Sequence, residues 1–189
     1  MTTRAPVRPP GRAPGPGDAP ATGAPAESVP ADDLAIMPAG VAAAAVDLFS
    51  RPFTQLAVGD RFETAARTVQ ESDILGFADL TGDAHPQHVD PEWAAGSRFG
   101  EQIAHGLLVL SFAVGLLPLD PDRVVALRRV GDAVFKQPVK IGDSVHVEGE
   151  ITGTRELDPE HGLVESRIRI VNQHGRLAVR AGVELVWRA

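Results

Sequence analysis

The chain has 189 residues, of which 43% are hydrophobic, so it can form one domain of ordinary size with a buried core and a tail. Its formal net charge of −7 argues against a nucleic-acid or anionic-membrane surface, and the absence of cysteine excludes disulfides, thiolate zinc sites and a cysteine nucleophile. No apolar run approaches the ~20 residues of a membrane span, and residues 1–20 lack the apolar centre of a secretory signal, so we expect a cytoplasmic protein.

The first part of the chain is dominated by proline. Nine of the sixteen prolines lie before residue 40, mixed with Gly, Ala and Thr. Such a segment buries too little surface to offset its ordering entropy, so we predict a disordered tail over residues 1–35. The tail could dock a partner, but a solvated extension is the simpler interpretation. Arg4, Arg8 and Arg12 are typical of an organelle presequence, but the prolines would block the amphipathic helix that such a sequence needs.

We expect a connector over residues 36–58 and then one domain over residues 59–189. The connector contains "GVAAAAVDLF" (40–49), which predicts a short helix that docks on the main body. The domain opens with "RFETAARTV" (61–69), whose weak alternation of apolar and polar side chains predicts a strand or an extended entry.

The next segment, "QESDILGFADLTG" (70–82), has its apolar side chains at helical spacing. Ser72 is a suitable N-cap and Gly82 a suitable end, because serine accepts backbone N–H groups and glycine adopts the left-handed conformation of a helix terminus. This helix is followed by "TGDAHPQHVD" (81–90), the segment in which carboxylate and imidazole side chains are concentrated.

Two further helical segments follow. The first, "DPEWAAGSRFG" (90–100), predicts a short helical turn with Asp90 as cap, Pro91 in the first position and Gly96 at the end. The second, "IAHGLLVLSFAVGLLP" (103–118), is apolar nearly all round, which predicts a helix buried on every side. Its composition would also suit a buried strand, but its length and its closing proline favour the helix.

The rest of the chain has the alternation and the Val and Ile content of strands. The breaks contain turn residues, and "KIGDS" and "NQHGR" predict hairpins. The four strand segments are "VVALRRVGDAVFKQPV" (124–139), "DSVHVEGEITGTREL" (143–157), "GLVESRIRIVNQ" (162–173) and "RLAVRAGVELVWR" (176–188). We therefore predict an α+β fold in which an antiparallel sheet wraps around one long hydrophobic helix.

The segment 81–90 can bring a carboxylate and an imidazole to one point. Asp83 and His88 lie five residues apart in an expected turn, and a histidine with an unperturbed pKa near 6.5 exchanges protons at neutral pH. Downstream, Gly106 lies at the start of the apolar helix, where free backbone N–H groups stabilise a developing oxyanion. Together these groups suit proton abstraction beside a carbonyl with loss or addition of water.

A structural interpretation of the same residues stays open. Asp83 can accept backbone N–H groups of a turn, and His85 and His88 can cap the loop. A zinc site made by these two histidines and the flanking carboxylates is a weaker alternative, and we expect no metal and no cofactor.

Three motifs in this order resemble the MaoC-like, hot-dog-fold (R)-specific enoyl-CoA hydratases and dehydratases: "GDAHPQHVD", "FGEQIAHGLL" and "VFKQPVKIGDSV". The resemblance extends from about residue 60 to the end. It implies a sheet wrapped around one helix and a homodimer whose sheets join edge to edge. It also implies that Asp83 and His88 are the catalytic pair that grips the water, and that the Gly106 N–H polarises the thioester carbonyl.

The chain departs from the family pattern at two positions. The usual asparagine of the loop is His85 here, where a neutral histidine can make the same bracing hydrogen bond. Several hydratases have a serine at the position of Val114, and Ser111, one helical turn earlier, is the candidate to replace it. These departures leave the catalytic pair intact and bear on rate and substrate preference.

By this resemblance the leading function is a hydratase or dehydratase that interconverts (R)-3-hydroxyacyl and trans-2-enoyl thioesters carried by coenzyme A or an acyl carrier protein. A hot-dog thioesterase is the second candidate, although the central helix has no acidic residue, and a non-catalytic acyl-binding or scaffold subunit of a heteromer is the third. We expect no nucleic-acid or membrane partner. The candidate cations for the carrier phosphate are Arg98, Arg128, Arg129, Lys136 and Lys140.

Overall fold

Long strands and one apolar helix make up most of the computed structural model, which describes residues 42–189. The predicted tail over residues 1–35 lies outside this range. The helices are α1 (Ala42–Phe49), the 3-10 turn η2 (Phe53–Gln55), α2 (Glu71–Thr81), α3 (Pro86–Val89), α4 (Pro91–Ala95) and α5 (Gly106–Leu116). The strands are β1 (Arg61–Glu63), β2 (Arg67–Thr68), β3 (Val124–Phe135), β4 (Ser144–Asp158), β5 (His161–Asn172) and β6 (Leu177–Arg188).

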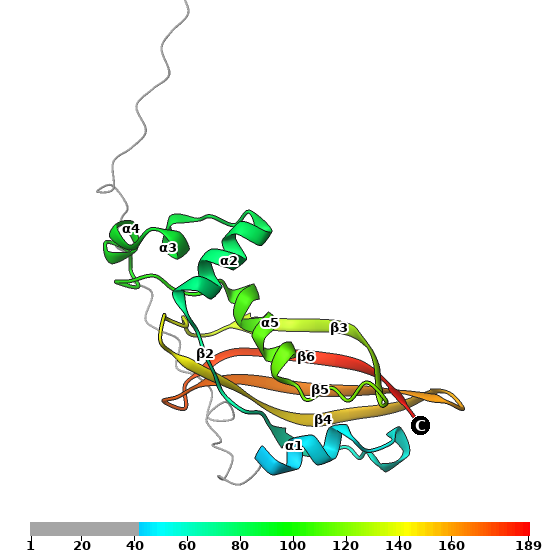
Figure 1. Cartoon of the computed structure of the whole chain (residues 1–189). Coiled ribbons are helices and arrows are strands. Elements are labelled where there is room, and N and C mark those ends of the chain that lie inside the picture. Colours follow the sequence, from blue (N-terminus) through cyan, green and yellow to red (C-terminus); the bar gives the residue numbers. More distant parts are fainter. Residues whose placement is uncertain (1–41) are drawn as a thin grey trace, which may run out of the picture. The chain divides into compact units, whose positions relative to one another are not determined.

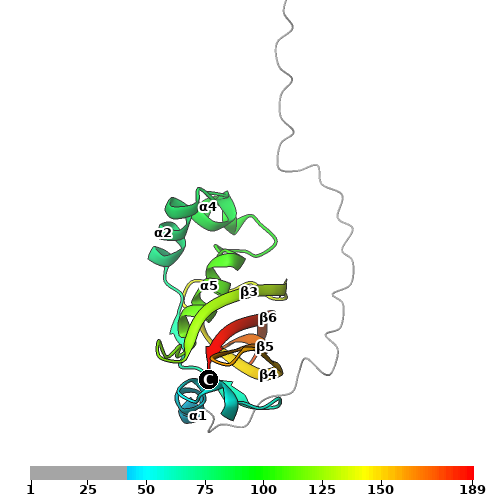
Figure 2. The same cartoon turned by 90° about the vertical axis from the view of Figure 1, so that its right-hand side faces the viewer.

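The sheet is antiparallel in the order β1-β4-β5-β6-β3, and β2 pairs with β4 beside β1. Helix α5 lies across one face of this curved sheet (Figures 1 and 2). Alternate side chains of β6, including Ala181, Val183 and Leu185, are buried, as a strand with one covered face requires. The predicted α+β hot-dog arrangement and its four long strands are confirmed.

Helix α5 is covered by the sheet on one side only. Leu108, Val109 and Ala113 are buried, whereas Leu107 is 62% exposed and Ser111 is also exposed. The prediction that this helix is buried on every side is therefore wrong for the single chain. A sheet covers one face of a helix, and the same apolar composition on the other face needs a further partner. Among residues 42–189, no helix is both long and apolar enough to cross a bilayer.

Helix α1 confirms the short helix expected before the domain, and it packs on the main body. The ring of Phe49 lies 5.2 Å from that of Phe62 in an edge-to-face arrangement and 5.3 Å from that of Trp187. The indole N–H of Trp187 donates to the carbonyl of Arg51 at 2.8 Å. These contacts join α1 to strand β6.

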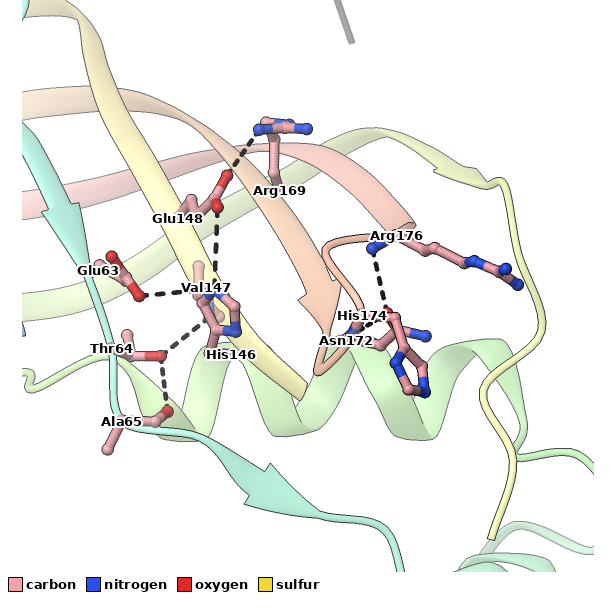
Figure 3. Close-up of polar contacts among 10 residues, drawn as sticks. All are labelled: Glu63, Thr64, Ala65, His146, Val147, Glu148, Arg169, Asn172, His174 and Arg176. Atoms are coloured by element: carbon pink, nitrogen blue, oxygen red, sulfur yellow. Dashed lines mark hydrogen bonds and ion pairs between the residues drawn. The ribbon is translucent and has the colours of Figure 1, made fainter. Parts of the chain in front are cut away.

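Of the two predicted hairpin turns, the one between β5 and β6 is confirmed. The one at "KIGDS" is a turn but not a hairpin, because the strands on either side of it, β3 and β4, pair with β6 and β5 instead of with each other. In the β5–β6 turn, the side-chain oxygen of Asn172 accepts the backbone N–H groups of His174 and Arg176 at 3.0 and 3.1 Å (Figure 3). Gly175 has φ 72° in this turn, and Gly142 has φ 88° in the turn before β4. Both turns thus use glycine at a left-handed position that other residues rarely adopt.

A charged cluster lies on β1, β4 and β5 (Figure 3). Arg169 donates to Glu148 at 2.6 Å, while the Nε2 of His146 lies 3.6 Å from Glu63 and 3.8 Å from Glu148. The Glu148 carboxylate raises the pKa of His146 above its ordinary 6.5, against a smaller effect of burial, and Glu63 adds to the rise.

We predict that His146 makes the stability of the fold depend on pH. Its pKa is raised in the folded state, so its contribution is complete below the unfolded value and is lost as the pH rises through the folded value. The free energy of unfolding should therefore fall between about pH 6 and about pH 8, and His146→Gln should flatten this slope. Urea titrations of both proteins across this range measure the effect. Equal slopes for the two proteins would contradict the assignment.

Candidate active site

The segment 81–90 is positioned by the end of α2. Gly82 adopts the left-handed conformation with φ 78°, and its N–H donates to the carbonyl of Ala78 at 2.8 Å, as predicted for the helix end. The predicted N-cap Ser72 is wrong. The cap is Gln70, whose side chain and that of Asp73 bond reciprocally to the backbone in a capping box.

The candidate histidine lies on the single-turn helix α3, where the sequence predicted an irregular turn. His85 is the N-cap of α3, and its Nδ1 accepts the N–H of Gln87 at 3.2 Å. The His85 ring also meets Trp93 edge to face at 5.5 Å. His85 therefore has the capping contact that the structural interpretation assigned to it, and it directs His88 into the site.

Asp90 is the cap of α4, as predicted. Its Oδ1 accepts the N–H groups of Glu92 and Trp93, both at 3.0 Å, and α4 ends at Gly96. Of the two carboxylates in this segment, Asp90 therefore binds the backbone, and Asp83 is the one left as a candidate for proton transfer.

His88 is held in one tautomer. Its Nδ1 lies 2.7 Å from the carbonyl oxygen of Ile103. Because a carbonyl oxygen can only accept a hydrogen bond, the neutral ring has its proton on Nδ1, and Nε2 has a free lone pair. Burial of the ring lowers the pKa of His88 below its ordinary 6.5; the bond to Ile103 offsets this in part, and His105 adds to the lowering. The ring is therefore neutral at neutral pH and ready to take a proton.

The structure adds a residue that the sequence analysis missed. His105 is only 2% exposed, and its Nε2 lies 2.9 Å from the backbone carbonyl of Asp83. Its ring stacks on that of His88, with centroids 3.9 Å apart and planes at 30°. Asp83, His88 and His105 each offer a polar side-chain atom, and these atoms lie within 4.8 Å of one another. The only sequence signal was its place directly before Gly106 in "IAHGLL".

Gly106 begins α5, as predicted, beside this cluster. Its N-cap His105 makes no side-chain capping bond, so the first-turn N–H groups keep their donor capacity at the positive end of the helix dipole. A Cβ at this position would lie 2.6 Å from Cε1 of Phe135, so any larger residue here would force that ring to move. Helix α5 thus presents donors for a developing negative charge.

The structure does not bring two other candidate residues into the cluster. Ser111 is exposed, and its hydroxyl donates to the carbonyl of Leu107 on its own helix at 2.8 Å. Arg98 is exposed as well, with its guanidinium carbon 5.2 Å from the ring centre of Phe99.

Several candidate phosphate-binding cations have partners within the chain. Arg128 and Arg129 both pair with Glu184, at 2.8 and 3.1 Å, and Lys140 pairs with Glu101 at 2.6 Å. These pairs leave Arg98 and Lys136 as the two candidates without an ion pair inside residues 42–189.

The donor set suits proton transfer better than metal binding. The rings of His85 and His88 are 6.2 Å apart, and His85 Nδ1 is already engaged by the backbone. His88 and His105 are stacked, so their in-plane lone pairs run side by side rather than converge on one ion. A carboxylate, a neutral imidazole and helix N–H donors at one place can instead move protons beside a polarised carbonyl.

The comparisons agree with this geometry. A family model described as "MaoC like domain" matches residues 53–173. The chain is 39% identical over 100 residues to "Protein MaoC" of Klebsiella aerogenes, a match that covers 52% of this chain and 30% of that protein. It is 36% identical over 108 residues to an "(R)-specific enoyl-CoA hydratase" of Aeromonas caviae, covering 57% of this chain and 78% of the relative.

A solved structure is also similar. It is described as "Monoamine oxidase regulatory protein" from Archaeoglobus, and it superposes with a TM-score of 0.68 at 35% identity, covering 73% of this chain and 94% of that one. Of the two relatives, the chain spans less than a third of the longer protein and most of the shorter one.

Proposed function

Since this chain belongs to the family of MaoC-like domains, we propose that it is an enzyme that adds water to trans-2-enoyl thioesters, or removes it from (R)-3-hydroxyacyl thioesters. The name of the Aeromonas relative supports this reaction, because that protein is called an (R)-specific enoyl-CoA hydratase. The observation that carries the proposal is the convergence of the Asp83 and His88 side chains beside the N-terminus of α5.

In the proposed hydration, one water lies between the Asp83 carboxylate and Nε2 of His88. The water oxygen bonds to C3 of the enoyl group while Nε2 takes one of its protons, and a proton passes to C2 through the same pair. The N–H groups at the start of α5 stabilise the charge that develops on the thioester oxygen. Dehydration is the reverse. Water and protons are all that the reaction moves, so the proposal includes no cofactor.

The proposed substrate is carried by coenzyme A or an acyl carrier protein. Arg98 and Lys136 are the cations that we assign to its phosphates, because phosphate is bound well by fixed positive charge and neither has an ion pair in the described part of the chain. We also propose that the protein is cytoplasmic, as its composition leads us to expect.

A spectroscopic assay tests the reaction. Short and medium trans-2-enoyl-CoA substrates should lose their conjugated-enoyl absorbance when the protein is added, with no release of free thiol. Free thiol at the same rate would indicate the thioesterase alternative, although α5 has no Asp or Glu. No change with any chain length would favour the non-catalytic acyl-binding subunit.

The pH dependence of hydration follows from the state of His88. The base must be neutral, and burial lowers its pKa below 6.5, so kcat/KM should rise with pH through a midpoint below that value and then level off near neutrality. Initial rates between about pH 5 and about pH 8 measure this limb. A midpoint above the ordinary histidine value would contradict the assignment.

We also propose a homodimer joined through the edge strand β3. β3 is the last strand of the sheet order, and its exposed apolar side chains are Val125, Leu127, Val130 and Phe135. An apolar edge of this length, beside the uncovered face of α5, is unfavourable in water. A heteromer with a related chain would cover the same exposed apolar side chains.

We predict that Leu127→Asp weakens the dimer by roughly 10²-fold, because a charge would be buried at the interface without a partner. The matched control is Val58→Asp, since Val58 is 62% exposed in the loop before β1 and should leave the dimer intact. Light scattering over a range of protein concentrations gives the dissociation constants. A monomeric wild-type chain would contradict the proposal.

A further inference from the structure

We propose that His105 is a positioning residue that fixes both members of the acid–base pair, holding the Asp83 backbone by a hydrogen bond and the His88 imidazole by ring stacking. This inference rests on the proposed function, in which Asp83 and His88 carry the protons. Neither nitrogen of the buried His105 side chain faces solvent, so the residue acts through its two neighbours.

The hydrogen bond fixes the tautomer of His105. The carbonyl of Asp83 only accepts, so the proton of the neutral ring lies on Nε2. Nδ1 is buried and has no hydrogen-bond partner in the described part of the chain. The bond from Nε2 to the carbonyl of Asp83 is therefore the contact that holds this side chain in place.

The stacking fixes the plane of the His88 ring. One side of that ring lies against His105, with centroids 3.9 Å apart, and its Nδ1 is bonded to Ile103. His105 is backed in turn by Phe77, with ring centroids 5.0 Å apart. The stacking and the hydrogen bond together fix the direction in which Nε2 of His88 points. Such precision matters because a small displacement of a reacting group lowers the reaction rate.

His105 also joins two parts of the chain. Asp83 follows the left-handed Gly82 in an exposed connection between α2 and α3, whereas His105 is the N-cap of α5. The bond between them therefore locates Asp83 relative to the N–H donors in the first turn of α5. The titratable groups that face His88 are Asp83, His85 and His105.

Three substitutions separate the two contacts. His105→Phe keeps a ring for stacking and removes the donor, His105→Gln keeps a donor and removes the ring, and His105→Ala removes both. We expect kcat to fall by roughly 10²-fold for the alanine variant and roughly 10-fold for each of the others, with KM within about threefold. The matched control is His161→Gln, in a hairpin far along the chain, which should match wild type.

A measurement made without substrate tests the role of His105 independently of the proposed enzyme activity. Nitrogen NMR of the wild-type protein should show His105 with its proton on Nε2, as the bond to the Asp83 carbonyl requires. The His88 titration should move to higher pH in His105→Ala, where water reaches the ring, and should change little in His105→Phe.

Each outcome decides the inference. An active enzyme whose His105 variants lose stability but keep the wild-type kcat would overturn it, and so would a His105 that carries its proton on Nδ1. A wild-type protein that hydrates no enoyl-CoA would refute the proposed function alone, and the NMR measurements would still decide the role of His105. A reduced kcat with the expected tautomer and His88 shift supports the inference.

Discussion

Asp83→Asn and His88→Ala should each lower the turnover of trans-2-enoyl-CoA by roughly 10²-fold or more while leaving the fold intact. Asp83 is exposed and its carboxylate serves no helix cap, so the amide changes chemistry rather than packing. Nε2 of His88 is the proposed base, and alanine removes it. Steady-state rates, with circular dichroism to check folding, measure the effect.

The double variant should be little worse than either single variant, because in the proposed reaction both groups hold the same water. Asp90→Asn is the matched control, since Asp90 caps α4 and asparagine is an equally good N-cap. It should keep wild-type turnover. A near-normal rate in either single variant would show that the proton transfers use other residues.

Trp187→Ala should lower the free energy of unfolding by about 3–5 kcal/mol, as truncation of a fully buried aromatic side chain does. Trp187 is 1% exposed, packs on Phe49 and donates its N–H to the carbonyl of Arg51. The alanine variant loses both the packing and the donor, and it leaves a cavity between β6 and α1.

The chain offers a second tryptophan as the control. Trp93 is 48% exposed, so Trp93→Ala should cost about 1 kcal/mol or less. Urea unfolding of the two variants gives the comparison. If the two variants were equally stable, α1 and the end of β6 would not form part of the cooperative core.

The sequence predicted the elements whose signals are local. Strands β3 to β6 are rich in Val and Ile over twelve or more residues each, and glycine lies in the turns before β4 and before β6. Gly82 and Asp90 were found because a helix end and a cap each depend on one residue type. Helix α3 was missed because four residues are too few to show a helical period.

The remaining differences come from contacts that no local pattern reveals. The N-cap of α2 shifted from Ser72 to Gln70 because the reciprocal bond with Asp73 satisfies two backbone groups instead of one. His105 meets Asp83 across 22 positions of sequence, so its role depends on how α5 lies against the loop. The exposed face of α5 could not be predicted either, because apolar composition does not say which surface covers it.

The order of the strands also bears on how the chain folds as it leaves the ribosome. β3 emerges before β4, β5 and β6, yet the strand that it pairs with is β6, which lies between β5 and β3. Until Leu177 and the residues after it are synthesised, β3 is an unpaired strand with several exposed apolar side chains. We therefore expect nascent chains that stall before β6 to be prone to aggregation.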